Sequence, residues 1–271
     1  MSNSAKCLSF GVGCQIEKDH VQCIAAGWKP WAIAPQVRSS GKSYACASEK
    51  VDVVMARKED QLKRIIDTGV VAIVRVDSSE QLVDVVRAIA DGGVTCVEVT
   101  MTTPNALQVI SDTAQRFGED VLIGVGSVLD AETARMAILA GAQFVVGPTL
   151  NHEVIAMCRR YSKVVMPGTF TPTEIVEAWQ SGADLVKVFP ASLGGPELIS
   201  ALKGPLPQIL LVPTGGVTAE NAGEFILAGA AAVAAGTSLV SKELVKNKDF
   251  KGLTERAGRF ATAIAKAREK H

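Results

Sequence analysis

From residue 70 onward, short apolar runs alternate with amphipathic stretches of helical period, and this alternation constrains the fold more than any other feature. The runs are apolar at successive positions, which is typical of strands buried on both faces of a parallel sheet. Eight parallel strand–helix units predict a (β/α)₈ barrel, the TIM-barrel architecture, in a single domain. The strands are expected at 70–76, 96–101, 121–128, 144–148, 164–170, 185–190, 209–215 and 232–238.

Turn residues separate these units. We expect Gly92, Gly141, Gly182 and Gly229 to end helices in the left-handed conformation, while Ser, Thr, Asp or Asn begins several of them. An open, doubly wound sheet is the alternative fold. The sequence favours the barrel, because no G-x-G-x-x-G follows the first strand and "GVGSVLDAE" has only the first two glycines of that motif.

The first fifty residues differ from the rest in composition. They are rich in serine, small and basic residues, and their only acids are Glu17, Asp19 and Glu49. This composition predicts an organelle transit peptide over 1–50, disordered and cleaved near Cys46 or Ala47, with the plastid stroma as destination. The alternative is a retained, disordered extension on a cytoplasmic protein. The barrel is expected over 51–271.

Composition narrows the possible partners. The formal net charge is zero and only 5% of residues are aromatic, so nothing indicates binding to nucleic acid. No apolar stretch reaches the length of a membrane span, so we expect a soluble protein without a membrane partner. The six cysteines form no C-x-x-C and the three histidines are scattered, so neither a zinc site nor a triad is expected.

Three charged residues interrupt the apolar strands. Arg75, Glu98 and Lys187 occupy positions that alternate with outward-facing apolar residues, so each is expected to point into the barrel. One such charge alone is best explained by a salt bridge or a solvated strand end. Three charges of both signs in one barrel predict a shared polar pocket, because burying an unused charge is costly.

A lysine among apolar residues has its charged form disfavoured, and a neighbouring arginine acts in the same direction. The neutral amine attacks a carbonyl to form an imine, and a carboxylate such as Glu98 can then move the protons. Lys187 and Glu98 therefore predict imine chemistry such as aldol cleavage. From these residues alone, transaldol, dehydratase and decarboxylase reactions stay open.

The loops after the seventh and eighth strands point to a phosphorylated substrate. Gly215 and Gly216 follow one strand, and Gly236, Thr237 and Ser238 follow the next. Backbone N–H groups in these loops of a barrel are a common phosphate site, although each loop alone could be only a tight turn.

These residues lie in stretches that resemble the KDPG/KHG aldolase family, from about residue 56 to 267. The matching stretches include "GGVTCVEVTMTTPNAL", "IGVGSVLDAETA", "MPGTFTPTEI", "VKVFPASLGGP", "LVPTGGVTAEN" and "AAGTSLV", in the family's order. The resemblance implies a (β/α)₈ barrel, a homotrimer, no metal or organic cofactor, and a class I aldolase acting on a small phosphorylated keto acid.

The resemblance also implies the roles of individual residues. It makes Lys187 the Schiff-base lysine and Glu98 the acid/base carboxylate. Substrate-binding roles fall on Arg75, Thr100, Thr102, Ser127, Phe189, Gly215, Gly216 and Ser238, with the last three holding phosphate, Ser127 near the keto-acid carboxylate and Phe189 beside the imine.

The sequence departs from many bacterial members at Thr102, where they carry an arginine that binds the substrate carboxylate. Our hypothesis is that Arg75 supplies this charge. The expected reaction is cleavage of 2-keto-3-deoxy-6-phosphogluconate to pyruvate and glyceraldehyde 3-phosphate. Cleavage of 4-hydroxy-2-oxoglutarate or of the galactonate epimer, a metal-free isomerase or epimerase, and a non-catalytic phosphometabolite-binding barrel are the alternatives.

Overall fold

The computed structural model describes residues 13–17, 20–24, 57–75 and 79–270. The chain separates into two units, Met1–Asp52 and Val53–His271. In the first unit, β1 (Gly13–Glu17) and β2 (His20–Ile24) pair as antiparallel strands, so the expected absence of regular structure is wrong for these two segments. Their β-branched residues favour strand formation. The predicted cleavage region near Cys46 lies outside the described residues.

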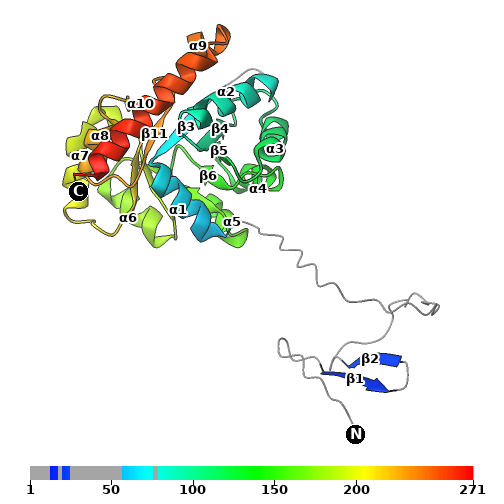
Figure 1. Ribbon diagram of the computed structural model, residues 1–271. Helices are drawn as coiled ribbons and strands as arrows, with labels where there is room; N and C mark the ends of the chain where they lie inside the picture. Colours follow the sequence, from blue (N-terminus) through cyan, green and yellow to red (C-terminus); the bar gives the residue numbers. More distant parts are fainter. Residues whose placement is uncertain (1–12, 18–19, 25–56, 76–78, 271) are drawn as a thin grey trace. The chain divides into compact units, whose positions relative to one another are not determined.

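The second unit contains the alternating strands and helices (Figure 1). Its strands are β3 (Val70–Val74), β4 (Cys96–Thr100), β5 (Leu122–Gly126), β6 (Phe144–Val146), β7 (Val164–Met166), β8 (Gly168–Thr169), β9 (Val186–Val188), β10 (Leu211–Pro213) and β11 (Val233–Ala235). They begin and end within the expected ranges but are shorter. The fifth expected strand is divided at Pro167 into β7 and β8, because proline has no N–H to donate to the ladder.

The strands form a parallel ring. One sheet has the order β11-β3-β4-β5-β6-β7, and a second has the order β10-β9-β8. A parallel bridge between Thr214 and Ala234 joins β10 to β11, and β7 continues into β8, which closes the ring. The predicted (β/α)₈ barrel is confirmed.

Helices surround this ring, except that the first one contributes Ile65 to the interior cluster and contacts β3, β4 and β7 (Figure 1). They are α1 (Lys58–Thr68), α2 (Ser79–Asp91), α3 (Ala106–Phe117), α4 (Ala131–Leu139), α5 (His152–Arg160), α6 (Pro172–Gln180), α7 (Gly195–Lys203), α8 (Ala222–Leu227), α9 (Lys242–Lys246) and α10 (Phe250–Arg268), with a 3₁₀ turn at Ala191–Leu193. The last helix, α10, packs against both α8 and α2, and Thr254 Oγ1 donates to Ala88 O at 2.8 Å. None of the described helices is long and apolar enough to cross a bilayer.

Local sequence explains where these helices begin and end. Thr171 and Glu174 form a reciprocal capping box at the start of α6. Gly141, Gly182 and Gly229 have positive φ angles after their helices, as expected. After α2 the left-handed residue is Gly93 rather than Gly92, whose missing Cβ instead lets α10 approach closely.

Buried apolar side chains form two clusters. One fills the interior of the barrel, and the other lies between the strands and the surrounding helices. The interior cluster includes Val71, Cys96, Leu122, Phe144, Leu185 and Val212. Gly124 makes room for the Phe144 ring, because an added Cβ would lie 2.4 Å from it. These residues form a packed floor, so ligands are restricted to the carboxyl ends of the strands.

Candidate active site

Lys187 is buried in the centre of β9, with 6% of its surface exposed. Backbone hydrogen bonds hold the strand on both sides, since Lys187 N donates to Pro167 O at 3.0 Å and Thr214 N donates to Val188 O at 2.9 Å. Thr169 Oγ1 also donates to Lys187 O, at 3.0 Å. The backbone of β9 is therefore held between two neighbouring segments, the one at Pro167–Thr169 and the one that ends at Thr214.

Glu98 occupies the centre of β4 and is 2% exposed. Space for its carboxyl comes from the neighbouring strand, where an added Cβ on Gly126 would lie 1.7 Å from Glu98 Oε1. Sequence reasoning missed Gly126. The available signal was two glycines, Gly124 and Gly126, on the same face of an otherwise apolar strand.

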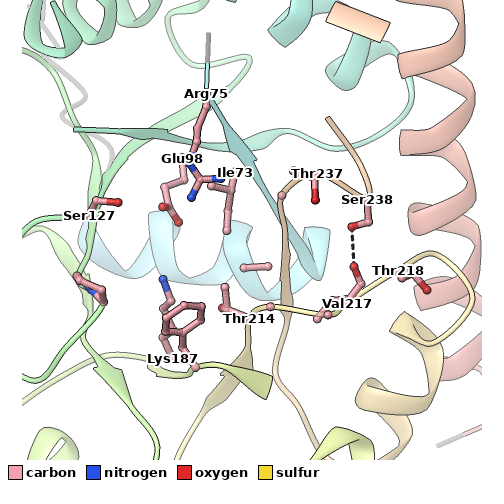
Figure 2. A pocket seen from close by; sticks show the side chains of 16 residues that line it. Ile73, Arg75, Glu98, Ser127, Lys187, Thr214, Val217, Thr218, Thr237 and Ser238 are labelled. Atoms are coloured by element: carbon pink, nitrogen blue, oxygen red, sulfur yellow. Dashed lines mark hydrogen bonds between the residues drawn. The ribbon is translucent and has the colours of Figure 1, made fainter. Parts of the chain in front are cut away.

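The strands β4 and β9 stand on opposite sides of the ring, and their charged side chains point toward each other (Figure 2). Among the described ion pairs, none joins Lys187 to Glu98, so a reacting group or a water can lie between them. Nζ of Lys187 also lies 5.0 Å from the centre of the Phe189 ring.

Burial moves both groups toward their neutral forms. It lowers the pKa of Lys187 below its ordinary value; Glu98 opposes this shift and Arg75 adds to it. Burial also raises the pKa of Glu98, opposed by Lys187 and Arg75. A neutral amine is the nucleophilic form, so this environment favours attack on a carbonyl.

Arg75 lies one residue beyond the end of β3, and its side chain is exposed rather than buried in the strand. It still reaches the same site, because an added Cβ on Gly236 would lie 3.7 Å from Arg75 Nη1. The guanidinium thus lies beside the loop that follows β11, at the mouth of the site.

A pocket of about 500 Å³ joins these groups at the carboxyl ends of the strands. It is lined by eight predicted residues, Arg75, Glu98, Ser127, Lys187, Phe189, Gly215, Gly216 and Ser238, and by the expected loop residues Gly236 and Thr237. No sequence motif predicts the other lining residues, which are Ile73, Pro148, Thr214, Val217, Thr218 and Ala234. Ser127 has a φ of 61°, an uncommon conformation for a non-glycine residue that often marks functional sites.

The two glycine loops border one side of this pocket. Gly215 and Gly216 have φ angles of 87° and 77°, a conformation that favours glycine. Of the two hydroxyls in the second loop, Ser238 Oγ donates to Val217 O at 2.6 Å (Figure 2), whereas Thr237 is exposed. Thr237 is therefore better placed than Ser238 to donate a side-chain hydrogen bond to a phosphate.

Thr100 and Thr102 are not among the residues that line this pocket. Thr100 is fully buried, and its Oγ1 lies 2.8 Å from Thr102 Oγ1, so the two hydroxyls bond to each other. Thr102 is exposed and lines an adjacent pocket that shares Arg75. The expectation that both threonines contact substrate receives no support from this arrangement.

A serine, a histidine and a carboxylate, the residue types of a catalytic triad, contact one another on the surface away from this pocket. His152 Nδ1 lies 2.9 Å from Ser181 Oγ, and His152 Nε2 lies 2.9 Å from Glu177 Oε1. All three side chains are on the surface, and Ser181 Oγ donates its proton to Glu177 O at 2.7 Å. The hydroxyl is thus not presented to the imidazole, and the contact links α5 to α6.

Comparison with known proteins gives the same assignment as the geometry. The family model for KDPG and KHG aldolases matches residues 61–255. The chain belongs to the KDPG and KHG aldolase family. This KDPG/KHG aldolase is therefore a lyase of the aldolase type, and its chemistry is expected at the pocket that contains Lys187 and Glu98.

Similar proteins carry related names. The 2-dehydro-3-deoxy-phosphogluconate aldolase of Treponema pallidum is 37% identical over 186 residues, covering 68% of this chain and 88% of its own. The 2-dehydro-3-deoxy-6-phosphogalactonate aldolase of Escherichia coli K12 is 36% identical over 170 residues, covering 62% of this chain and 83% of its own. The crystal structure of KDPG aldolase from Legionella pneumophila, with pyruvate captured as a covalent carbinolamine, is 27% identical, covers 73% of this chain and 96% of its own, and gives a TM-score of 0.69.

Proposed function

We propose that this aldolase cleaves 2-keto-3-deoxy-6-phosphogluconate to pyruvate and glyceraldehyde 3-phosphate through an imine on Lys187. The observation that carries the proposal is the buried lysine facing a buried carboxylate, in a pocket bordered by two glycine loops. The names of similar proteins and the captured pyruvate in the Legionella enzyme support the same reaction.

The reaction begins when neutral Lys187 Nζ attacks the C2 carbonyl carbon. Loss of water gives a protonated imine, which accepts electrons from the adjacent bonds. Glu98, through a water in the gap between the two side chains, removes the proton of the C4 hydroxyl. The C3–C4 bond breaks, glyceraldehyde 3-phosphate leaves, and pyruvate remains as its enamine.

Glu98 then returns a proton to C3, which converts the enamine into the imine of pyruvate. Water hydrolyses this imine and restores the free amine. We propose that Gly215, Gly216 and the loop at Gly236 hold the phosphate through backbone N–H groups, and that Ser127 lies near the substrate carboxylate. No metal or organic cofactor takes part in these steps.

Trapping with borohydride tests this proposal. Incubation with pyruvate and borohydride should add the mass of one reduced pyruvate to the wild-type chain and nothing to Lys187→Ala. Lys163→Ala is the matched control, because burial lowers the pKa of Lys163 as well, yet this lysine lies outside the pocket. An unmodified wild-type chain, or an adduct that persists in Lys187→Ala, would contradict the imine on Lys187.

The substrate needs a separate assay. The alternatives are 4-hydroxy-2-oxoglutarate and the galactonate epimer, the latter favoured by similarity to the E. coli galactonate enzyme. Turnover of the three compounds, compared as kcat/KM, decides among them. Binding without turnover of any keto acid would instead support a non-catalytic barrel that holds phosphorylated metabolites.

We also propose that the protein assembles as a homotrimer through a surface at α4. Leu129, Met136 and Leu139 are 59%, 48% and 65% exposed, and Met136 and Leu139 lie one helical turn apart. Large exposed apolar groups favour association. Light scattering should give a trimer for wild type and a smaller species for Leu139→Asp; an unchanged mass would exclude this surface.

For the leader, we propose that residues 1–50 direct the protein to the plastid stroma. Its serine-rich, basic and acid-poor composition supports this destination. A fusion of residues 1–50 to a fluorescent protein should enter chloroplasts of leaf cells. Fluorescence in the cytoplasm would favour the retained extension, and fluorescence in mitochondria would show a different destination.

A further inference from the structure

The loop that follows β10, at residues 215–218, is held by a side chain that lies outside the main pocket. All four residues of this β10 loop line the pocket, whereas Asn221 does not. The Asn221 side chain nevertheless contacts the loop twice, because its Nδ2 donates to Gly216 O at 3.0 Å and its Oδ1 accepts from Thr218 N at 2.8 Å. One amide group therefore ties two positions of the loop together.

The direction of the Asn221 side chain is unusual for its place in the chain. Asn221 is the N-cap residue of α8, where an asparagine ordinarily accepts a hydrogen bond from a backbone N–H in the first turn of the helix. Here the side chain makes no such bond. It turns back toward the preceding loop instead, so capping of α8 does not explain an asparagine at this position.

The carbonyl and N–H groups of the β10 loop differ in their partners. Asn221 binds the carbonyl of Gly216, and Ser238 Oγ donates to the carbonyl of Val217 (Figure 2). Among the hydrogen bonds of the described chain, none uses the N–H of Gly215, Gly216 or Val217. Consecutive N–H groups left free in a turn form a site for an anion.

We infer that Asn221 is a positioning residue for the phosphate of the substrate. By holding Gly216 O and Thr218 N, it keeps the β10 loop in the conformation in which the N–H groups of Gly215 and Gly216 are free to bind an anion. Glycine has more backbone freedom than any other residue, so two adjacent glycines need such an external restraint. Without it the loop has to be ordered when the phosphate binds, and this cost weakens binding. The inference rests on the proposed function, which places the phosphate at this loop.

Calorimetric titration of the full chain with glycerol 3-phosphate tests the inference, because this monoester carries a phosphate but has no carbonyl that could form an imine. Asn221→Ala should bind it about tenfold more weakly than wild type, since two hydrogen bonds that order the loop are lost. Binding as tight as in wild type would overturn the inference.

Asn151→Ala is the matched control. Asn151 is the N-cap residue of α5, and its side chain also bonds to backbone groups, accepting from Glu153 N at 2.9 Å and donating to Leu129 O at 3.0 Å. None of these three residues lines the main pocket. Asn151→Ala should therefore bind glycerol 3-phosphate as wild type does, and an equal loss of binding in the two variants would contradict a specific role of Asn221.

A kinetic comparison separates positioning from a general loss of structure. Asn221→Ala should raise KM about tenfold for the phosphorylated keto acid while kcat changes less than about twofold, because only binding is affected. The yield of borohydride-trapped pyruvate, which has no phosphate, should not change, nor should KM for 4-hydroxy-2-oxoglutarate. A fall in kcat with both substrates, or loss of the pyruvate adduct in this variant, would show a structural role and reject the inference.

Asn221→Asp is a second variant that retains part of the contact. Its carboxylate can still accept from Thr218 N but cannot donate to Gly216 O, so it should also bind glycerol 3-phosphate more weakly than wild type; unchanged binding would count against the inference. The two proposals fail separately. A wild-type chain that traps pyruvate but binds no glycerol 3-phosphate would refute the role of Asn221 alone. Monoester binding that depends on Asn221, without any pyruvate adduct, would support that role and refute the imine on Lys187.

Discussion

Only glycine fits at position 126, because Glu98 fills the space beside it. A Cβ on Gly126 would lie 1.7 Å from Glu98 Oε1 and 2.3 Å from its carboxyl carbon. Both residues lie on neighbouring strands in which every side chain is buried, so neither can move into solvent. The position of the Glu98 carboxyl therefore depends on the absence of a single methyl group at residue 126.

The first prediction is that Gly126→Ala displaces Glu98 and severely reduces turnover. We expect kcat to fall about a hundredfold or more, as for loss of a positioned acid/base group. Overpacking should also lower the free energy of unfolding by about 1–3 kcal/mol. The pyruvate adduct on Lys187 should still form, which steady-state kinetics and mass spectrometry of the trapped protein would show.

Gly204→Ala is the control for this substitution. Gly204 is exposed, has a φ of −54°, and an added Cβ would meet only Ala201 O, at 3.5 Å. Alanine is compatible with this conformation, so stability should be unchanged or slightly higher. If Gly126→Ala were as active as Gly204→Ala, Glu98 would not depend on the space at Gly126.

The second prediction concerns the pH dependence of adduct formation at Lys187. Its amine must be neutral to attack, so the initial rate should rise with pH, with a midpoint below the ordinary lysine pKa of 10.5, because burial lowers the pKa. Arg75→Met removes a charge that lowers this pKa and should move the midpoint up. Glu98→Gln removes a charge that raises it and should move the midpoint down.

These opposite shifts are measured from initial rates of borohydride trapping across pH, each variant normalised to its own plateau. Normalisation separates a change in the pKa of Lys187 from any loss of proton transfer. Shifts in the same direction for Arg75→Met and Glu98→Gln would show that these charges do not control the amine.

The third prediction assigns the phosphate hydroxyl to Thr237 rather than Ser238. Thr237→Val should raise KM about threefold to tenfold for a phosphorylated substrate, the effect of one hydrogen bond, with little change for 4-hydroxy-2-oxoglutarate. Ser238→Ala removes the bond to Val217 O and should lower stability by about 1 kcal/mol. A larger rise in KM for Ser238→Ala than for Thr237→Val would reverse the assignment.

The sequence predicted the barrel and its inward residues because both depend on local periodicity. Two-residue alternation is enough to place Lys187 and Glu98 on the inner face, and the count of eight units is enough to put their strands in one ring. Periodicity does not reveal that Thr100 and Thr102 lie outside the lining of the main pocket, because the chain turns after β4 and pairs their hydroxyls with each other. Such a pairing depends on backbone direction beyond the strand, which periodicity does not contain.

Other features depend on contacts between distant segments. The bond from Ser238 to Val217 O joins two loops and leaves Thr237 as the exposed hydroxyl. The clearance at Gly126 follows the same rule, since it depends on the Glu98 side chain that the neighbouring strand presents. A glycine in an apolar strand shows that the position is unusual. The sequence alone does not show which neighbouring side chain requires the glycine.

The last prediction concerns Arg75, which lines both the pocket of Lys187 and the adjacent pocket at Thr102. Our hypothesis that it replaces a carboxylate-binding arginine at position 102 predicts that Arg75→Ala raises KM about tenfold for both phosphorylated and non-phosphorylated keto acids. Its guanidinium also lies beside Gly236, in the loop that we propose holds the phosphate, so a rise in KM for the phosphorylated substrate alone would assign it to phosphate. An unchanged KM for both would remove it from substrate binding.

Thr102→Arg in the Arg75→Ala background is the complementary experiment. Thr102 is exposed and lines the pocket next to Arg75. If Arg75 supplies positive charge near the substrate carboxylate, a new guanidinium at position 102 should recover part of the affinity lost in Arg75→Ala.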